Sequence, residues 1–294
     1  MKAFTIATAT LLLLFAPLWA QAQASKQVEV FGQKIHYLEA GAGPNVILLH
    51  GLGGDSTNWI ATTSALATKF HVWVPDQIGF GASDKPMIPY RVGTLVDFLE
   101  GFCKKAGIDK ATVVGNSLGG WTAMAFTLAH PERVEKLVLV DSAGYSFEKS
   151  GTPKPAKQAL QGLNPSTIEG SKAVLGIIFA NKSFATQANA EAFFTSHLKK
   201  NDGYTIDQFI ESILRGEDFL DGKLGGIKSP TLVLWGRGDM LTPLASGQMF
   251  AKDIPGAQIA IFDNCGHVPQ MECAGPFNSA LLRFLLSGSV EASK

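Results

Sequence analysis

The chain has 294 residues, of which 46% are hydrophobic and 17% are charged, and 25 Lys and Arg residues balance 25 Asp and Glu residues. This length accommodates one large α/β domain or two modest ones, with a sizeable core. The balanced charge, without a basic stripe, excludes nucleic acid as a partner, because such binding depends on neutralising phosphates.

Residues 1–24 have the pattern of a secretory signal peptide: a basic start, an apolar run over Thr10–Ala16 and the small-x-small sequence Ala22-Gln23-Ala24. We expect cleavage after Ala24 and a periplasmic or secreted protein without a stable membrane span. An uncleaved membrane anchor is the alternative, although a proline and several polar residues make this segment a poor span.

The segments after residue 25 alternate between strand and helix patterns. Val28–Phe31 and Lys34–Glu39 flank a Gly-Gln pair and predict a β-hairpin. Continuous apolar runs predict strands of a parallel sheet, buried on both faces, at Val46–Leu49, Val72–Val74, Ala111–Val114, Leu137–Val140, Thr231–Leu234 and Ile259–Phe262. With amphipathic stretches between and after these runs, the predicted fold is an α/β, doubly wound, mostly parallel sheet.

Residues 146–226 interrupt this alternation, because they contain helical patterns such as Gln208–Leu214 but no strong strand. The stretch is too long for an ordinary connection between a helix and a strand. We therefore expect a helical cap, inserted after the sixth core strand, over the edge of the sheet where such folds bind ligands. The core would comprise residues 25–145 and 227–294.

The segment Gly115-Asn116-Ser117-Leu118-Gly119 lies between a predicted strand and a predicted helix. In that setting the glycines allow a tight turn that exposes Ser117 as a nucleophile at a helix N-terminus. A glycine-rich phosphate loop and a plain helix entry are the alternatives. No Lys-Ser or Lys-Thr pair follows, as a phosphate loop requires.

A nucleophilic serine needs a base, and the base needs an acid that orients it. His267 follows a predicted strand downstream of Ser117 and is the expected base. Asp239, which follows the strand Thr231–Leu234, is the expected acid. Asp141 also ends a strand and is the competing candidate, since the chain order Ser, Asp, His fits either.

An oxyanion formed at Ser117 needs two N–H donors. We expect them from Leu118, directly after the nucleophile, and from Leu52 in the glycine loop His50-Gly51-Leu52-Gly53-Gly54. A plain turn is the alternative for this loop. No metal or organic cofactor is expected, because this machinery supplies both nucleophile and base, and no His/Cys pair has zinc-ligand spacing.

The sequence has three cysteines, Cys103, Cys265 and Cys273. Cys265 and Cys273 are close enough in sequence to pair in an oxidising compartment. We favour two buried, unpaired thiols, because spacing alone does not establish disulfide geometry.

The chain resembles α/β-hydrolases of the capped esterase and C–C hydrolase type over nearly all of residues 26–288. The segments that carry the resemblance are His50–Gly53, Asp76–Asp84, Gly115–Gly119, Gly236–Asp239 and Gly266–Pro269. The resemblance implies a triad of Ser117, Asp239 and His267, oxyanion donors at Leu52 and Leu118, and a lid near residues 146–226.

A serine nucleophile, rather than the aspartate of related dehalogenases and epoxide hydrolases, predicts acyl transfer. We expect hydrolysis of small-molecule carboxylic esters with short to medium, apolar groups, through an acyl-enzyme on Ser117. Thioester, lactone or amide hydrolysis is an alternative, and a non-catalytic binding module is the last.

The main rival is C–C bond hydrolysis of a vinylogous diketone, because Gly115-Asn116-Ser117 resembles that subgroup. Two features speak against this rival. Val268 stands where the subgroup usually has Trp, and Arg215 is the only obvious lid residue that could hold a substrate carboxylate. Export would also disfavour a step of intracellular aromatic catabolism. The sequence does not predict an oligomeric state.

Overall fold

The computed structural model describes residues 23–290, so most of the expected signal segment, residues 1–22, lies outside the described residues. An eight-stranded sheet has the order β1-β2-β4-β3-β5-β6-β7-β8. The strands are β1 (Ala24–Val30), β2 (Gln33–Ala40), β3 (Asn45–Leu49), β4 (His71–Pro75), β5 (Ala111–Asn116), β6 (Val134–Val140), β7 (Thr231–Gly236) and β8 (Gln258–Phe262).

The sheet is mostly parallel. Strands β1 and β2 form an antiparallel hairpin, and β2 also pairs antiparallel with β4. The remaining neighbouring pairs, from β4 to β8 in the sheet order, are parallel. The expected doubly wound α/β class is confirmed, because the apolar runs form strands covered by helices.

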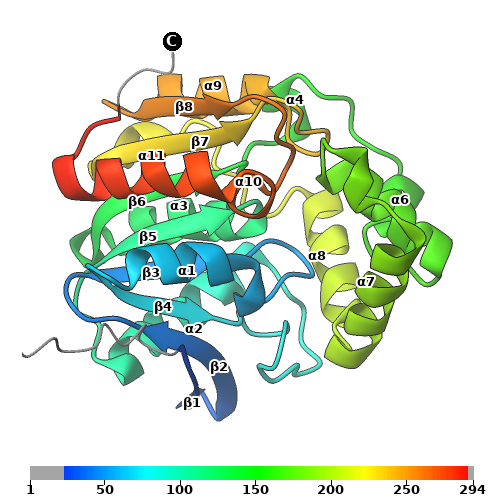
Figure 1. Cartoon of the computed structure of the whole chain (residues 1–294), viewed down its shortest axis with the longest axis horizontal. Coiled ribbons are helices and arrows are strands. Elements are labelled where there is room, and N and C mark those ends of the chain that lie inside the picture. The colour runs from blue at the N-terminus through cyan, green and yellow to red at the C-terminus, as the bar shows by residue number, and fades with distance from the viewer. Residues whose placement is uncertain (1–22, 291–294) are drawn as a thin grey trace, which may run out of the picture.

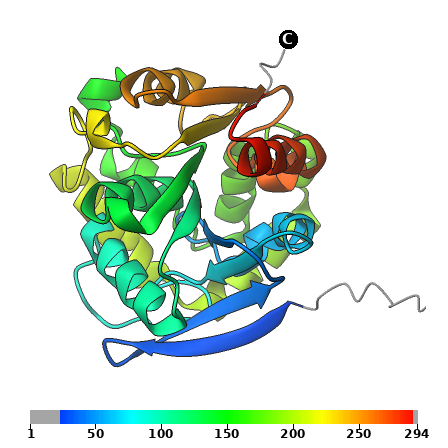
Figure 2. The same cartoon turned by 90° about the vertical axis from the view of Figure 1, so that its left-hand side faces the viewer.

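Helices cover both faces of the sheet (Figures 1 and 2). One face packs against α1 (Ile60–Leu66) and α11 (Ala274–Ser287), and the other against α2 (Val92–Ala106), α3 (Leu118–Ala129) and α9 (Leu244–Asp253). Alternate residues of β3 point to opposite faces. Val46 and Leu48 pack on the face covered by α1 and α11, and Ile47 and Leu49 pack on the face covered by α2, α3 and α9.

The segment between β6 and β7 is helical and lies beside one end of the sheet (Figure 1). Its helices are α4 (Phe147–Ser150), α5 (Lys157–Gln161), α6 (Ile168–Ile178), α7 (Gln187–Lys200) and α8 (Gly203–Arg215), followed by the 3₁₀ turn η4 (Leu224–Gly226). The apolar side of α8 faces the core, where Phe209 stacks on Phe80 with ring centroids 5.8 Å apart. Within residues 23–290, no helix is long and apolar enough to cross a membrane.

Candidate active site

Ser117 occupies the sharp turn between β5 and α3. Its backbone adopts φ 55° and ψ −117°, a conformation that costs a non-glycine residue on the order of 1–3 kcal/mol. Glycine is required on both sides: a Cβ at Gly115 would lie 2.1 Å from Gly119 O, and one at Gly119 would lie 2.3 Å from Leu49 O. The strained turn therefore depends on close backbone packing that only these glycines permit.

Asp239 and His267 come from the loops after β7 and β8, and the structure brings them together. His267 Nδ1 lies 2.9 Å from Asp239 Oδ2, in a contact that is buried for both side chains. Leu241 N and Thr242 N donate to the other oxygen, Asp239 Oδ1, at 2.8 and 3.0 Å. Burial raises the pKa of this carboxyl, but the charge and hydrogen bond of His267 and the Thr242 donors prevail, so its pKa is lowered.

The side chain of the residue before Ser117, rather than the Ser117 hydroxyl, connects the serine turn to the histidine loop. Among the described residues, no hydrogen bond joins the Ser117 side chain to His267. Instead, the Asn116 side chain donates to the backbone carbonyl of His267 at 2.9 Å and to that of Val140 at 3.1 Å. Catalytic contacts often tighten only when substrate binds, so this arrangement is compatible with a serine nucleophile.

Asp141, the competing acid, faces a different partner. Its Oδ1 accepts a hydrogen bond of 2.9 Å from Gly236 N, whereas the histidine contact belongs to Asp239. Asp141 is fully buried, and this burial together with the Asp239 carboxylate raises its pKa well above the ordinary value.

The two expected oxyanion donors flank the serine turn. Within residues 23–290, neither Leu52 N nor Leu118 N donates a hydrogen bond, so both amides are available to a ligand. His50 shapes the glycine loop beneath Leu52. Because Gln77 N donates to His50 Nε2 at 3.0 Å, Nδ1 carries the proton and donates to Gly51 O at 2.8 Å. Burial lowers the pKa of His50, which keeps this neutral form.

Glu272, which the sequence analysis did not single out, binds the histidine loop to the helical insertion. It ends the short helix α10 (Pro269–Glu272), and its carboxylate accepts from Gly266 N at 2.6 Å, Asn181 N at 2.6 Å and Ala180 N at 3.2 Å. Its position five residues after His267 was the signal available in the sequence.

The insertion also contacts the site directly. Ile178 O, at the end of α6, accepts a hydrogen bond of 2.8 Å from His267 N. On the opposite side, Lys200 Nζ at the end of α7 reaches Gly53 O at 3.0 Å and Asp55 Oδ2 at 2.7 Å. The insertion therefore holds both the histidine loop and the glycine loop.

The expectation of two unpaired thiols at Cys265 and Cys273 is wrong. The structure joins them in a disulfide, with Cα atoms 6.2 Å apart.

Arg215 was the only obvious lid residue for a substrate carboxylate. Its Nε donates to Glu217 at 2.8 Å on an exposed part of α8, so its charge is already paired.

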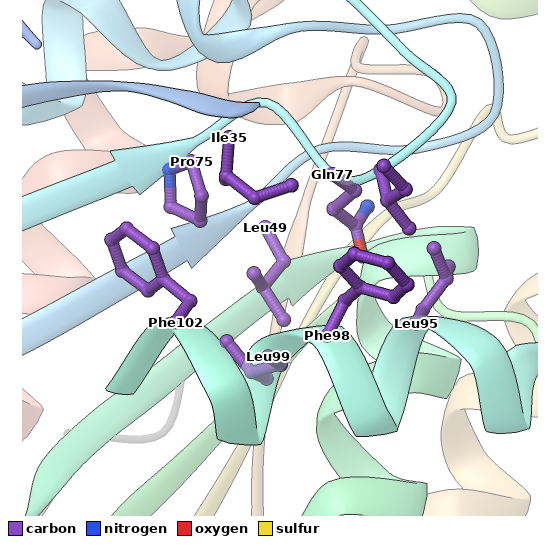
Figure 3. Close-up of a pocket in the computed structure, with 9 residues that line it drawn as sticks. Ile35, Leu49, Pro75, Gln77, Leu95, Phe98, Leu99 and Phe102 are labelled. Atoms are coloured by element: carbon purple, nitrogen blue, oxygen red, sulfur yellow. The ribbon is translucent and has the colours of Figure 1, made fainter. Parts of the chain in front are cut away.

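The described residues contain no cluster of His, Cys, Asp and Glu that could hold a metal ion. Figure 3 shows a cavity between α2 and the strands β2, β3 and β4, lined by Gln77 and by apolar side chains such as Ile35, Leu49 and Phe98. Its volume of about 20 Å³ has room for about one water. None of the expected catalytic residues lines it, so we do not assign substrate binding to it.

Residues 44–183 match the family described as alpha/beta hydrolase fold. A 2-hydroxy-6-oxononadienedioate/2-hydroxy-6-oxononatrienedioate hydrolase from Paraburkholderia phymatum is 34% identical, covering 90% of this chain and 96% of that protein. A meta-cleavage product hydrolase from Pseudomonas fluorescens superimposes with a TM-score of 0.80 at 28% identity, covering 92% and 99% of the two chains. A membrane phospholipase A superimposes with a TM-score of 0.77 at 28% identity, covering 90% and 86%.

The chain belongs to the α/β-hydrolase family, within a subgroup similar to C–C hydrolases. The expectation from the sequence that the substrates are carboxylic esters is wrong. The similarity to the dienedioate hydrolase spans nearly the full length of both chains and supports the rival C–C activity instead.

Proposed function

We propose that this protein is a serine hydrolase that cleaves a carbon–carbon bond of a 2-hydroxy-6-oxo-dienoate, a vinylogous diketone. The near full-length similarity to the dienedioate hydrolase carries this proposal. The buried Asp239–His267 pair and the strained serine turn supply machinery that fits it. Ser117 is the nucleophile, His267 the base, and Asp239 the acid that orients His267.

The first step is nucleophilic addition. His267 takes the Ser117 proton, the hydroxyl oxygen bonds to the 6-oxo carbon, and the carbonyl oxygen becomes an oxyanion. The N–H group of Leu52 lies on the glycine loop after β3, and that of Leu118 lies at the start of α3, directly after the serine. Both donate to this oxyanion. The hydrogen bond to Asp239 stabilises the imidazolium formed on His267.

The second step breaks the bond between C5 and C6. It requires the 2-oxo tautomer, in which the proton of the 2-hydroxyl group has moved to C5. The oxyanion on C6 then re-forms its carbonyl, and the electron pair of the broken bond passes through the conjugated double bond to the 2-oxo oxygen. This oxygen takes the proton from the His267 imidazolium, so His267 is again a neutral base. The products are a 2-hydroxydienoate and an acyl group on Ser117. Water, deprotonated by His267, then releases a carboxylic acid, so one substrate and one water give two acids.

A substrate of this class carries a carboxylate beside the 2-hydroxy group. Arg215 is bound to Glu217 on the surface. Lys200 is bound to Asp55 and to Gly53 O, so its charge is already balanced by a carboxylate. We therefore assign the substrate carboxylate to neither of these two cations.

The test compares the purified parent with Ser117→Ala on 2-hydroxy-6-oxononadienedioate and on p-nitrophenyl acetate and butyrate. We expect the parent to release the two acids, detected by mass spectrometry, and the variant to lose on the order of 10⁶ in kcat. Ester turnover without C–C cleavage by a folded parent would overturn the proposal.

We further propose that residues 1–24 direct export and are removed, in keeping with their basic, apolar and small-x-small pattern. Cell fractionation and the N-terminal sequence of the purified protein test this. A mature chain that begins at Ser25 in the periplasm or medium is expected, and an intact cytosolic chain would contradict it.

A further inference from the structure

Two buried carboxyl groups meet behind the histidine. Asp141 follows β6 and Asp239 follows the adjacent strand β7, so their side chains converge at the same edge of the sheet. Asp141 is 0% exposed and Asp239 is 8% exposed, and the Thr242 hydroxyl lies between the two residues, 3.1 Å from Asp141 O and 2.5 Å from Asp239 Oδ2. Two buried carboxyl groups this near to each other cannot both remain ionised without a large energetic cost, so one takes a proton.

The surrounding donors decide which carboxyl group stays ionised. Asp239 accepts from His267, from Leu241 N and from both the amide and the hydroxyl of Thr242. Asp141 accepts one hydrogen bond, from Gly236 N to Oδ1, and its Oδ2 receives none from the described residues. A carboxylate oxygen buried without a donor is costly, whereas a protonated oxygen there becomes a donor itself.

We propose that Asp141 is a protonated carboxylic acid that donates a hydrogen bond to Asp239, and thereby positions the acid of the catalytic site. The proposal agrees with the raised pKa of Asp141, which burial and the neighbouring Asp239 cause, and to which Glu272 adds a further negative charge. The charged groups facing the pair are therefore His267, which favours an ionised Asp239, and Glu272, which disfavours a second anion.

This arrangement separates the roles of the two acids that the sequence could not distinguish. The protonated carboxyl group of Asp141 donates to Asp239, and the same Asp239 carboxylate binds His267. The backbone of Asp141 adopts φ 43°, a left-handed conformation that Asp and Asn tolerate better than most residues. Asparagine is therefore a close mimic: its carbonyl can accept from Gly236 N, and its amide can donate to Asp239.

The inference rests on the proposed role of Ser117, so its test uses the rate at which a fluorophosphonate probe labels that serine, which does not require the natural substrate. A parent that leaves Ser117 unlabelled would count against the proposed nucleophile itself. Asp141→Asn retains the donor, and Asp141→Gly removes it without backbone strain. We expect Asp141→Asn to label at close to the parental rate and Asp141→Gly to label about 10²-fold more slowly.

Infrared spectroscopy gives a second readout that is independent of labelling. The parent at neutral pH should show the carbonyl stretch of a protonated carboxylic acid, and Asp141→Asn should lose it while the thermal unfolding temperature remains similar. A parent without this band, or an Asp141→Asn variant as slow as Asp141→Gly, would show that Asp141 works as a carboxylate and overturn the proposal. Equal labelling rates for all three proteins would also overturn it.

Discussion

The side-chain amide of Asn116 donates a hydrogen bond of 2.9 Å to the backbone carbonyl of His267, which lies 151 positions later in the chain. The same amide also donates to Val140 O. Asn116 thus joins the end of β5, next to the proposed nucleophile, to the loop of the proposed base, and both contacts are buried.

Asn116→Ala should leave the buried His267 carbonyl without a donor, whereas Val140 O keeps the hydrogen bond from Ser117 N. We expect the free energy of unfolding to fall by about 1–3 kcal/mol, and kcat to fall because the His267 loop loses its tie to the serine turn. Chemical denaturation and steady-state kinetics measure the two effects. Asn189→Ala, which removes an exposed amide bond to Phe184 O, is the control and should change stability by less than about 0.5 kcal/mol. Equal effects of the two substitutions would contradict the role given to Asn116.

Glu272→Gln should weaken the contact between the insertion and the histidine loop. The carboxylate accepts from three amide groups, whereas a glutamine turns an NH₂ group toward some of them. We expect a loss of about 2–3 kcal/mol in the free energy of unfolding, together with a lower kcat. Glu135→Gln, on an exposed position of β6, serves as the control and should behave like the parent. Unchanged stability of Glu272→Gln would argue that the hydrogen bonds between Glu272 and the three amide groups do not form in solution.

The Cys265–Cys273 disulfide closes a short ring around His267 and Glu272. Replacing both cysteines by serine should lower the free energy of unfolding by about 2–3 kcal/mol, because the unfolded chain gains freedom. A reductant should destabilise the parent by a similar amount and leave the double variant unchanged. The Cys103→Ala variant lacks only the free buried thiol, so a reductant should lower its stability as much as it lowers that of the parent. A parent insensitive to reductant would show that the pair is not bonded.

Asp76 should make stability depend on acidic pH. Burial opposes its ionisation, but the hydrogen bond from His36 and the amides of Ala82 and Ser56 lower its pKa to about 2. Because the folded pKa is below the unfolded value near 3.8, the stabilisation is present above pH 3.8 and is lost as the pH falls toward 2. The shift corresponds to about 2 kcal/mol. Unfolding measured between pH 2 and pH 5 should show this dependence in the parent and a flatter curve in Asp76→Asn.

Local patterns predicted the fold class, because hydrophobic periodicity is written in neighbouring residues. The runs Val46–Leu49 and Leu137–Val140 are apolar at every position, which requires burial on both faces and hence a covered parallel sheet. The serine turn was recognisable for the same reason: glycines at positions 115 and 119 surround Ser117 within five residues. Reaction type was not predictable in this way, since esterases and C–C hydrolases share these local patterns.

Tertiary structure decided what depends on distant segments. Asp141 and Asp239 both follow strands, and only the folded chain shows that Asp239 binds His267 whereas Asp141 accepts from Gly236 N. The Glu272 carboxylate accepts from the amide of Asn181, 91 positions earlier in the chain, and the Asn116 side chain donates to the carbonyl of His267, 151 positions later. The sequence by itself therefore determined the sheet and the serine turn, whose causes are local. The partners of each polar group were decided by the folded chain, because hydrogen bonds require proximity in space.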